Sequence, residues 1–187
     1  MTRSRTSFVV PCFQEEAAVP SFRALLPRIE ATEIVFVDDG STDRTAAQLD
    51  ALRADDARVR VVTHDVNRGV GAAMRTGIAA TSGDIVVVYD VDRTYPIEDA
   101  STLIDAVERG ADLATASPFL DAGATDDVPW PRLLLSRGVV AAYRWALGPR
   151  ADSIRTFTCA FRAYRGDWIR GLEFESDGFP AAAEILG

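Results

Sequence analysis

The sequence predicts an α/β fold in which a mostly parallel, doubly wound sheet is flanked by helices. Short apolar runs alternate with helical patterns over the first two-thirds of the chain. The runs at 33–38 and 84–89 consist mostly of apolar, β-branched residues, as expected for strands that are buried on both faces of a parallel sheet. The resulting β-α-β-α-β order is typical of doubly wound proteins.

Five strands are expected in this part of the chain, at residues 7–11, 33–38, 58–63, 84–89 and, as the weakest pattern, 111–117.

Helices are expected between the strands, at residues 42–54, 71–80 and 97–109. Ser41 or Thr42 can serve as the N-cap of the first helix, and Pro96 suits the opening of the third.

The last third of the chain has a different pattern. A turn-rich loop at 122–131 is followed by an amphipathic helix at 133–147, an alternating strand at 156–164 and a helix that begins at 179 and runs to 186. Neither repeats nor low-complexity linkers interrupt the 187 residues, so a single domain, 1–187, is predicted.

Composition predicts a soluble globular domain, because 48% of the residues are hydrophobic and 26% are charged. No apolar run approaches the roughly 20 residues that span a bilayer, and no signal peptide is visible. The two cysteines, Cys12 and Cys159, fit neither a disulfide framework nor a metal-binding spacing. A cytoplasmic location is therefore expected.

The charge is unevenly distributed. The chain carries a net charge of −8, yet residues 132–170 contain eight arginines and only two aspartates. Such a segment suits an anionic partner such as a phosphate or a lipid headgroup, although any single arginine can equally lie on a solvated helix face. Nucleic acid is not expected as a partner, because the net field is repulsive and no binding motif is present.

Acidic residues follow each of the first four predicted strands, and in open α/β sheets ligands bind at this carboxyl edge. They are Glu15 and Glu16, Asp38 and Asp39, Asp65, and Asp90 with Asp92. Gathered carboxylates repel one another unless a cation lies between them, and carboxylate oxygens suit Mg²⁺ or Mn²⁺. Taken alone, residues 38–43 can also be a simple Asx turn that leads into a helix.

At these residues the chain resembles the family 2 inverting glycosyltransferases, which have the GT-A fold, and within them the dolichyl/polyprenyl-phosphate sugar synthase branch. The matching stretches are VVPCFQEEAAV (9–19), EIVFVDDGSTDRT (33–45), NRGVGAAMRTGIAATSGDIVVVYDVDRTYPIED (67–99), SRGVVAAYRWALG (136–148), TFTCAFRAYR (156–165) and, more faintly, GFPAAAEIL (178–186).

The resemblance implies roles in donor binding. Asp90 and Asp92 match the DxD element, which holds the metal that bridges the diphosphate. The loop that covers the nucleotide contains Arg68 and Gly69, and an arginine there suits a phosphate or base contact. The residues expected to hold the base and the ribose are Pro11, Glu15 and Asp39, with Asp38 beside them.

Two more residues, besides Asp92, are implied in catalysis. Arg162 resembles an arginine near the transferred sugar or the acceptor phosphate. Glu184 matches a carboxylate near the sugar in some relatives, although an ordinary helix glutamate is an equally open interpretation. His64, the single histidine, is expected to have a structural or surface role rather than to act as a base.

The chain departs from the family pattern at several positions. Thr156 stands where many relatives have an aspartate that is proposed as the general base. Further departures are Gln14, Thr94 and Pro118. Relatives continue beyond position 187, so the domain is expected to be short at its C-terminal end.

A phosphate monoester is already ionised near neutral pH and needs no general base, so Thr156 favours a lipid phosphate as acceptor. The expected activity is therefore metal-dependent, inverting transfer of a hexose from a GDP- or UDP-sugar to a polyprenyl or dolichyl phosphate. Contact with the inner face of a membrane is expected to be peripheral or through a membrane partner.

Two alternatives remain open: transfer to a sugar or other hydroxyl, with Glu184 or Asp65 as base, and a weakly active nucleotide-sugar-binding domain that needs a partner. A nucleotidyltransferase is disfavoured because no Gly-rich phosphate loop follows the first strand.

Overall fold

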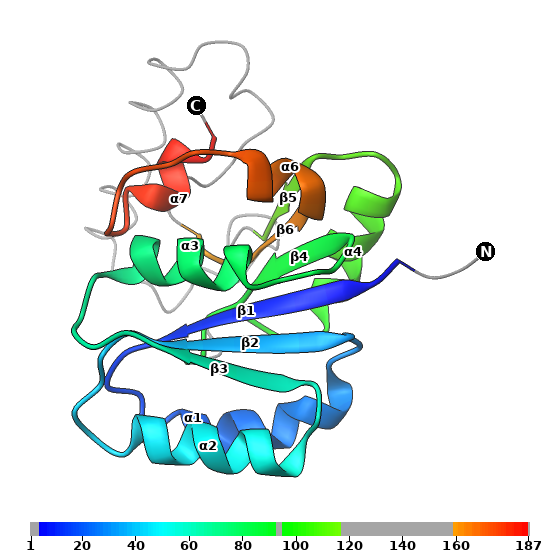
Figure 1. Ribbon diagram of the computed structural model, residues 1–187. Coiled ribbons are helices and arrows are strands. Elements are labelled where there is room, and N and C mark those ends of the chain that lie inside the picture. Colours follow the sequence, from blue (N-terminus) through cyan, green and yellow to red (C-terminus); the bar gives the residue numbers. More distant parts are fainter. Residues whose placement is uncertain (1–3, 93–94, 117–158, 187) are drawn as a thin grey trace, which may run out of the picture.

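The computed structural model describes residues 4–92, 95–116 and 159–186, and these form a six-stranded sheet with helices on both faces (Figure 1). The strand order is β3-β2-β1-β4-β6-β5. Four strands are parallel: β1 (Thr6–Cys12), β2 (Glu33–Asp38), β3 (Val59–Thr63) and β4 (Ile85–Val88). The short β5 (Leu113–Thr115) and β4 both pair antiparallel with β6 (Arg162–Arg165), which lies between them.

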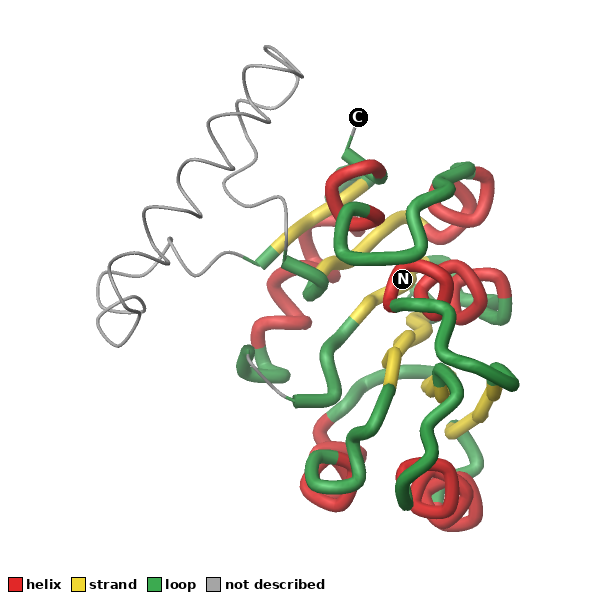
Figure 2. Tube along the Cα trace, turned by 90° about the vertical axis from the view of Figure 1, so that its left-hand side faces the viewer, coloured by secondary structure: helices red, strands yellow, loops and turns green. Residues whose placement is uncertain are grey.

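Two sets of helices cover the sheet, and Figure 2 shows helices on both sides of the strands. One face packs against α1 (Val19–Phe22), the 3₁₀ helix η1 (Arg23–Arg28), α2 (Thr45–Asp55) and α4 (Asp99–Glu108). The other face packs against α3 (Val70–Ala79), α6 (Gly166–Gly171) and α7 (Ala181–Glu184). Within the described ranges, no helix is long and apolar enough to cross a membrane.

Burial of the central strands on both faces explains their apolar sequences. In β1, Phe8 and Val10 point into the core beneath α1 and α2, whereas Val9 packs beneath α3. An aromatic cluster fills the larger core, with ring centroids 5.2 Å apart for Phe22 and Phe36 and 4.9 Å apart for Tyr89 and Phe161. These edge-to-face contacts join α1 to β2 and join the residue after β4 to the segment before β6.

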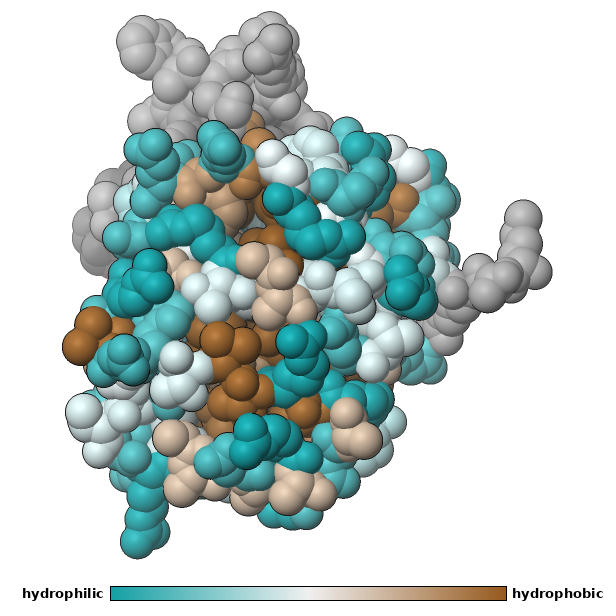
Figure 3. Space-filling view, viewed as in Figure 1, coloured by the Kyte–Doolittle hydropathy of each residue, from teal (hydrophilic) through white to brown (hydrophobic). Residues whose placement is uncertain are grey.

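At β3, which ends the sheet, burial is less complete. Val61 and Val62 are only partly buried there. Figure 3 shows hydrophobic side chains at the surface between α3 and α2, where this strand runs.

The predicted α/β fold is confirmed, and the five expected strands and three expected helices of the first two-thirds are present. The strand expected at 156–164 is β6, shifted to 162–165, and its antiparallel direction was not predicted. Neither α1, η1 nor α6 was predicted, because they are short and carry no long periodic pattern. The loop at 122–131 and the helix at 133–147 lie outside the described residues.

The predicted N-cap of the first helix was wrong. Helix α2 begins at Thr45, and the carboxylate of Asp43 accepts a hydrogen bond from the Thr45 amide at 2.9 Å. Ser41 and Thr42 instead use their side chains to bind Gln14 across the loop. Pro96 likewise precedes α4 by a turn instead of opening it.

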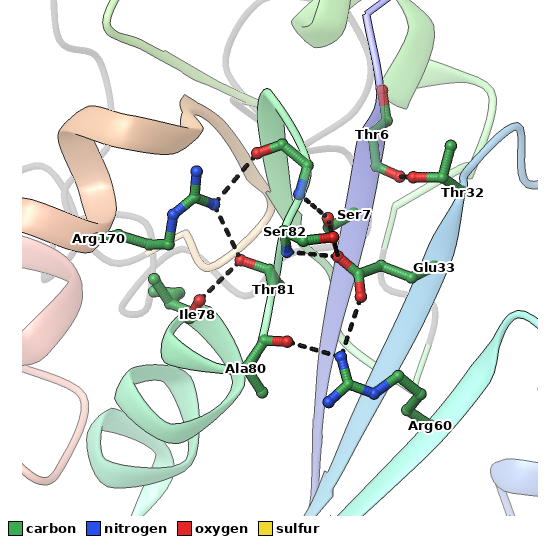
Figure 4. Close-up of polar contacts among 11 residues, drawn as sticks. Thr6, Ser7, Thr32, Glu33, Arg60, Ile78, Ala80, Thr81, Ser82 and Arg170 are labelled. Atoms are coloured by element: carbon green, nitrogen blue, oxygen red, sulfur yellow. Dashed lines mark hydrogen bonds and ion pairs between the residues drawn. The ribbon is translucent and has the colours of Figure 1, made fainter.

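A buried polar network fixes the end of the sheet opposite the acidic loops (Figure 4). Glu33 is 8% exposed, and its carboxylate accepts hydrogen bonds from the Ser7 hydroxyl, from the amide and hydroxyl of Ser82 and from Arg60. Burial alone would raise the pKa of Glu33, but these hydrogen bonds outweigh it and lower the pKa below its usual value. The network ties the turn between α3 and β4 to three neighbouring strands.

Replacing Glu33 with Gln should lower the free energy of unfolding by about 1–3 kcal/mol, because an amide cannot accept all of these hydrogen bonds. Since folding lowers the pKa of Glu33, its contribution is present above about pH 4.3 and disappears as the pH falls through the folded-state value. Urea unfolding between pH 7 and pH 3 should therefore show the difference between wild type and Glu33→Gln shrinking at low pH. Glu108→Gln, at an exposed position, is the control and should change stability by less than about 0.5 kcal/mol.

Candidate functional site

The acidic loops predicted from the sequence meet at one edge of the sheet. Because β1, β2, β3 and β4 are parallel, the loops that follow them all leave from the same edge (Figure 1). Strand β1 lies between β2 and β4, so the ends of the latter two are separated by two strand spacings, about 10 Å. That distance suits the two ends of one ligand the size of a nucleotide diphosphate.

The loop after β1 is held in place by the loop after β2. Gln14 adopts a φ of 57°, and its side-chain oxygen accepts hydrogen bonds from the amides of Thr42 at 3.0 Å and Asp43 at 3.2 Å. The amide of Glu15 donates to the Thr45 hydroxyl at 2.8 Å. Gln14, noted in the sequence only as a departure from the family pattern, therefore sets the backbone from which Glu15 projects.

Glu15, Asp90 and Asp92 form a cluster of carboxylates that repel one another. Burial, then the charge of Asp92, then that of Glu15 raise the pKa of Asp90 to about 6. Burial, followed by the charges of Asp92 and Asp43, raises the pKa of Glu15. Such a cluster is relieved by a cation, so the residues present fit a divalent metal.

The described residues contain no preformed group of three or more metal-binding side chains. In proteins, Mg²⁺ is commonly held by only one or two carboxylates, and substrate phosphates and water complete its shell. Asp90 and Asp92 stay the residues that are predicted to supply such carboxylates.

The second acidic pair is buried at the end of β2. Asp38 is 1% exposed, and one of its oxygens, Oδ1, accepts a hydrogen bond from the Ser41 amide at 3.0 Å. Its other oxygen, Oδ2, is buried with no hydrogen-bond partner among the described residues. A buried carboxylate oxygen without a donor is costly, so it is suited to accept an N–H or O–H group from a ligand.

Asp39 instead uses both carboxylate oxygens within the protein. Oδ1 accepts hydrogen bonds from the Arg68 amide at 3.0 Å and from the His64 ring at 2.6 Å, and Oδ2 accepts one from the Gly69 amide at 2.7 Å. Asp39 therefore orders the loop that begins α3. The guanidinium of Arg68 is exposed and makes no ion pair with the described part of the chain, so it can reach an anionic ligand.

Residues 174–178, about a hundred positions further along the chain, pack against the start of α3. The amide of Gly71 donates to the Asp177 carbonyl at 2.6 Å, and the Arg75 side chain binds the Ser176 carbonyl at 2.9 Å and the Asp177 carboxylate. Side chains larger than that of glycine would overlap the backbone of this segment at both Gly69 and Gly71, and Gly69 also has a φ of 96°. The conformation of the predicted nucleotide loop thus depends on residues 174–178.

Glu184 holds the same segment from its other side. Its two carboxylate oxygens accept hydrogen bonds from the amides of Glu175 at 2.8 Å and Ser176 at 2.9 Å. These bonds lower the pKa of Glu184, first through Ser176 and then through Glu175, which makes it a poor proton acceptor. Its contacts therefore favour a role in positioning the segment.

Arg162 is fully buried beneath α7, where its guanidinium donates to the Ala182 carbonyl. Two other arginines of the basic segment are also engaged. Arg165 pairs with Asp112 and Asp167, and Arg170 binds the Thr81 hydroxyl and the Gly83 carbonyl. These three arginines bind within the protein and are not placed to bind an anion. The other five arginines of the basic segment, and Thr156, lie outside the described residues.

Sequence reasoning missed Arg75 and the full part played by His64. Arg75 lies on α3 and gives no local signal of its contact with residues 174–177, because they are about a hundred positions away. His64 is buried, which is consistent with a structural role, and its ring nitrogen Nδ1 lies 2.6 Å from Oδ1 of Asp39. Its position immediately after a strand, at the ligand-binding edge, is the signal that could have identified it.

The fold is that of an α/β domain, and its candidate ligand site lies at the carboxyl ends of the parallel strands. The family model for glycosyl transferase family 2 matches residues 7–172. The chain therefore belongs to glycosyl transferase family 2.

The chain is similar to two curated enzymes. It is 31% identical to a dolichol-phosphate mannosyltransferase of Pyrococcus furiosus, over 97% of this chain and 52% of that protein. It is 32% identical to a polyprenol monophosphomannose synthase of Mycolicibacterium smegmatis, over 92% of this chain and 66% of that protein. The chain thus spans about half to two-thirds of the length of these relatives.

Among solved structures, the chain is similar to glucosyl-3-phosphoglycerate synthase of Mycobacterium tuberculosis in complex with Mn²⁺, UDP and glucosyl-3-phosphoglycerate. The TM-score is 0.71 at 25% identity, over 98% of this chain and 64% of that one. The predicted GT-A fold is confirmed by this likeness together with the family match.

Replacing Gly71 with Ala should lower stability by about 1–3 kcal/mol, because the new methyl group would overlap the Ser176 carbonyl and Ala181. Increased proteolysis within residues 172–178 should accompany the loss. Gly171→Ala is the matched control, since a methyl group there meets nothing within 4 Å, and it should be neutral to within about 0.5 kcal/mol. Equal stability of the two variants in thermal unfolding would contradict the close approach at Gly71.

Replacing Asp92 with Asn should lower the pKa of Asp90 from about 6 towards its ordinary value, because the Asp92 charge contributes to the shift after burial. Carboxyl-carbon NMR titration of the metal-free protein measures this directly. Asp65→Asn, which removes a charge from the same edge but not from the cluster, should leave the Asp90 titration in place. A pKa of Asp90 that is the same in Asp92→Asn and in wild type would show that the two carboxylates do not interact.

Proposed function

We propose that the chain is the donor-binding domain of an enzyme that transfers a hexose, with inversion, from a GDP- or UDP-sugar to a polyprenyl or dolichyl phosphate. The observation that carries this proposal is the meeting of the carboxylates of Glu15, Asp90 and Asp92 at the carboxyl edge of the sheet, beside Asp38. The similar enzymes named above support the class of acceptor.

In this proposal the nucleoside lies against the loops that follow β1 and β2. Pro11 and Glu15 flank it on one side, and the free Oδ2 of Asp38 accepts a hydrogen bond from the base or the ribose. Uracil and guanine both carry ring N–H groups that suit a buried acceptor. Both carboxylate oxygens of Asp39 accept hydrogen bonds within the protein. Asp39 therefore contributes by holding the loop of Arg68 and Gly69 and not by binding the ligand directly.

The diphosphate is proposed to lie between the exposed guanidinium of Arg68 and the two carboxylates of Asp90 and Asp92. Mg²⁺ or Mn²⁺ held by these aspartates would neutralise the charge that develops on the departing nucleotide. Arg68 adds a fixed positive charge on the other side. Mn²⁺ and UDP are bound together in the similar solved structure, which supports this arrangement.

The acceptor is proposed to be a phosphate rather than a hydroxyl group. A phosphate monoester attacks without a general base, whereas a hydroxyl needs a proton acceptor within reach. Glu184, one of the two carboxylates considered for that task, has both oxygens engaged and a lowered pKa. Contact with a membrane, peripheral or through a partner, remains part of this proposal because the acceptor is a lipid.

Replacing Asp92 with Ala should weaken Mn²⁺-dependent binding of UDP or GDP by at least roughly tenfold and leave the fold intact, because Asp92 is exposed and outside the core. Calorimetric titration with each nucleotide, with and without Mn²⁺, measures this and also identifies the base. Asp65→Ala removes an exposed carboxylate from the same edge and should bind like wild type. Unchanged affinity in Asp92→Ala would exclude the proposed metal site.

The acceptor is tested separately by transfer of radiolabelled hexose from UDP- or GDP-sugars into lipid that partitions into organic solvent. The label should appear with polyprenyl phosphate, disappear when EDTA is added, and be absent with polyprenol, which lacks the phosphate. Transfer to a soluble sugar or to phosphoglycerate instead would favour a hydroxyl acceptor. Nucleotide binding without any transfer would indicate a binding domain that needs a partner.

A further inference from the structure

His64 contacts both members of the buried acidic pair. Its backbone amide donates to the Asp38 carbonyl at 2.9 Å, and its ring nitrogen Nδ1 lies 2.6 Å from Oδ1 of Asp39. The other ring nitrogen, Nε2, lies 2.9 Å from the Thr76 hydroxyl. The residue is only 8% exposed, and these three contacts give partners to its backbone amide and to both of its ring nitrogens.

The direction of the hydrogen bonds follows from the chemistry of the partners. A carboxylate only accepts, so Nδ1 carries the hydrogen and donates to Asp39. With Nδ1 protonated, a neutral ring leaves Nε2 as an acceptor, which the Thr76 hydroxyl satisfies. The ring is thus anchored to the middle of α3 on one side and directs Asp39 on the other.

The Asp39 carboxylate, oriented by His64, holds the loop before α3 through hydrogen bonds from two of its backbone amides. Its Oδ1 is shared between His64 and the Arg68 amide, and its Oδ2 accepts the Gly69 amide at 2.7 Å. Without the donor from His64, the carboxylate is free to rotate away from two amides that it now holds. The loop it holds carries the exposed guanidinium of Arg68, and it lies against residue 40, since a side chain on Gly40 would overlap Val66 and Asn67.

We infer that His64 is a positioning residue for the nucleotide site: through Nδ1 it fixes the Asp39 carboxylate, and through Asp39 it sets the loop from which Arg68 reaches the diphosphate. This inference rests on the proposed function, because it assigns the loop to nucleotide binding. His64 itself touches no ligand. Its contribution is to keep the loop ordered before the nucleotide arrives, which lowers the entropic cost of binding.

Two substitutions separate this role from simple packing. The amide nitrogen of Asn at position 64 can occupy the place of Nδ1 and still donate to Asp39, whereas that of Gln can occupy the place of Nε2 and reach only Thr76. Both variants lose one of the two ring contacts and part of the ring. A purely structural histidine would be affected similarly by both changes, but a positioning residue would tolerate Asn and not Gln.

The test compares His64→Asn, His64→Gln and Thr76→Val with wild type, using UDP and GDP with Mn²⁺ in calorimetry. For the nucleotide that wild type binds, His64→Gln should weaken binding by roughly tenfold or more, because the nucleotide would then have to order the loop that carries Arg68 as it binds. Affinity in His64→Asn and Thr76→Val should stay within roughly threefold of wild type. Native-state hydrogen exchange should show faster exchange of the Arg68 and Gly69 amides in His64→Gln alone.

Equal affinity in His64→Gln and His64→Asn, or unchanged exchange of both amides in His64→Gln, would overturn the inference. If His64→Gln does not fold, His64→Asn decides: an affinity loss of tenfold or more despite a retained donor to Asp39 would also overturn it. Failure of wild type to bind either nucleotide would instead refute the proposed function and, with it, the role of His64 in nucleotide binding. In that outcome faster amide exchange in His64→Gln would still show that His64 orders the loop, so the two failures are distinguishable.

Discussion

The site depends on the buried carboxylate of Asp39. Removing a charge from water is costly unless its oxygens are fully hydrogen-bonded, and here the loop of Arg68 and Gly69 and the ring of His64 supply the donors. These donors come from segments that follow β3, while Asp39 follows β2. Satisfying one buried charge therefore forces two loops of the sheet edge into a single arrangement.

Two other carboxylates at this edge, those of Asp38 and Asp90, are not fully compensated by the protein. Asp90 lies among charges of its own sign, and Asp38 keeps one buried oxygen without a donor in the described residues. Both conditions cost stability in the isolated protein, and both are relieved by a ligand that brings a cation or an N–H group. The contrast between a satisfied Asp39 and these unsatisfied neighbours separates the framework of the site from the groups that are placed to bind.

A second layer of contacts supports that framework from the C-terminal part of the chain. Arg75 and Glu184 hold residues 174–177 against the start of α3, where glycine at positions 69 and 71 permits the close approach. Glu184 was selected from its resemblance to a carboxylate near the sugar, and Arg162 from its resemblance to an arginine there. Within the described residues, Arg162 donates to a carbonyl of α7, and Glu184, which lies in α7, accepts from the amides of Glu175 and Ser176. Both roles therefore stay predictions, and the contacts that are present hold the C-terminal part of the chain in place.

The sequence by itself determined the first five strands, the mostly parallel sheet and the acidic edge, because burial on both faces demands apolar runs and parallel strands must end together. The order of the strands and the antiparallel direction of β6 came only from the structure. It also identified the family, through local motifs at 33–45 and 67–99. The tertiary structure alone decided which acids are satisfied and which remain available, because hydrogen bonds such as those of His64 with Asp39 and Thr76 join residues that are distant in the chain. Local sequence patterns do not predict such long-range pairings. Asp38 and Asp39 are adjacent and chemically identical, so the difference in their hydrogen bonding arises only when the chain folds.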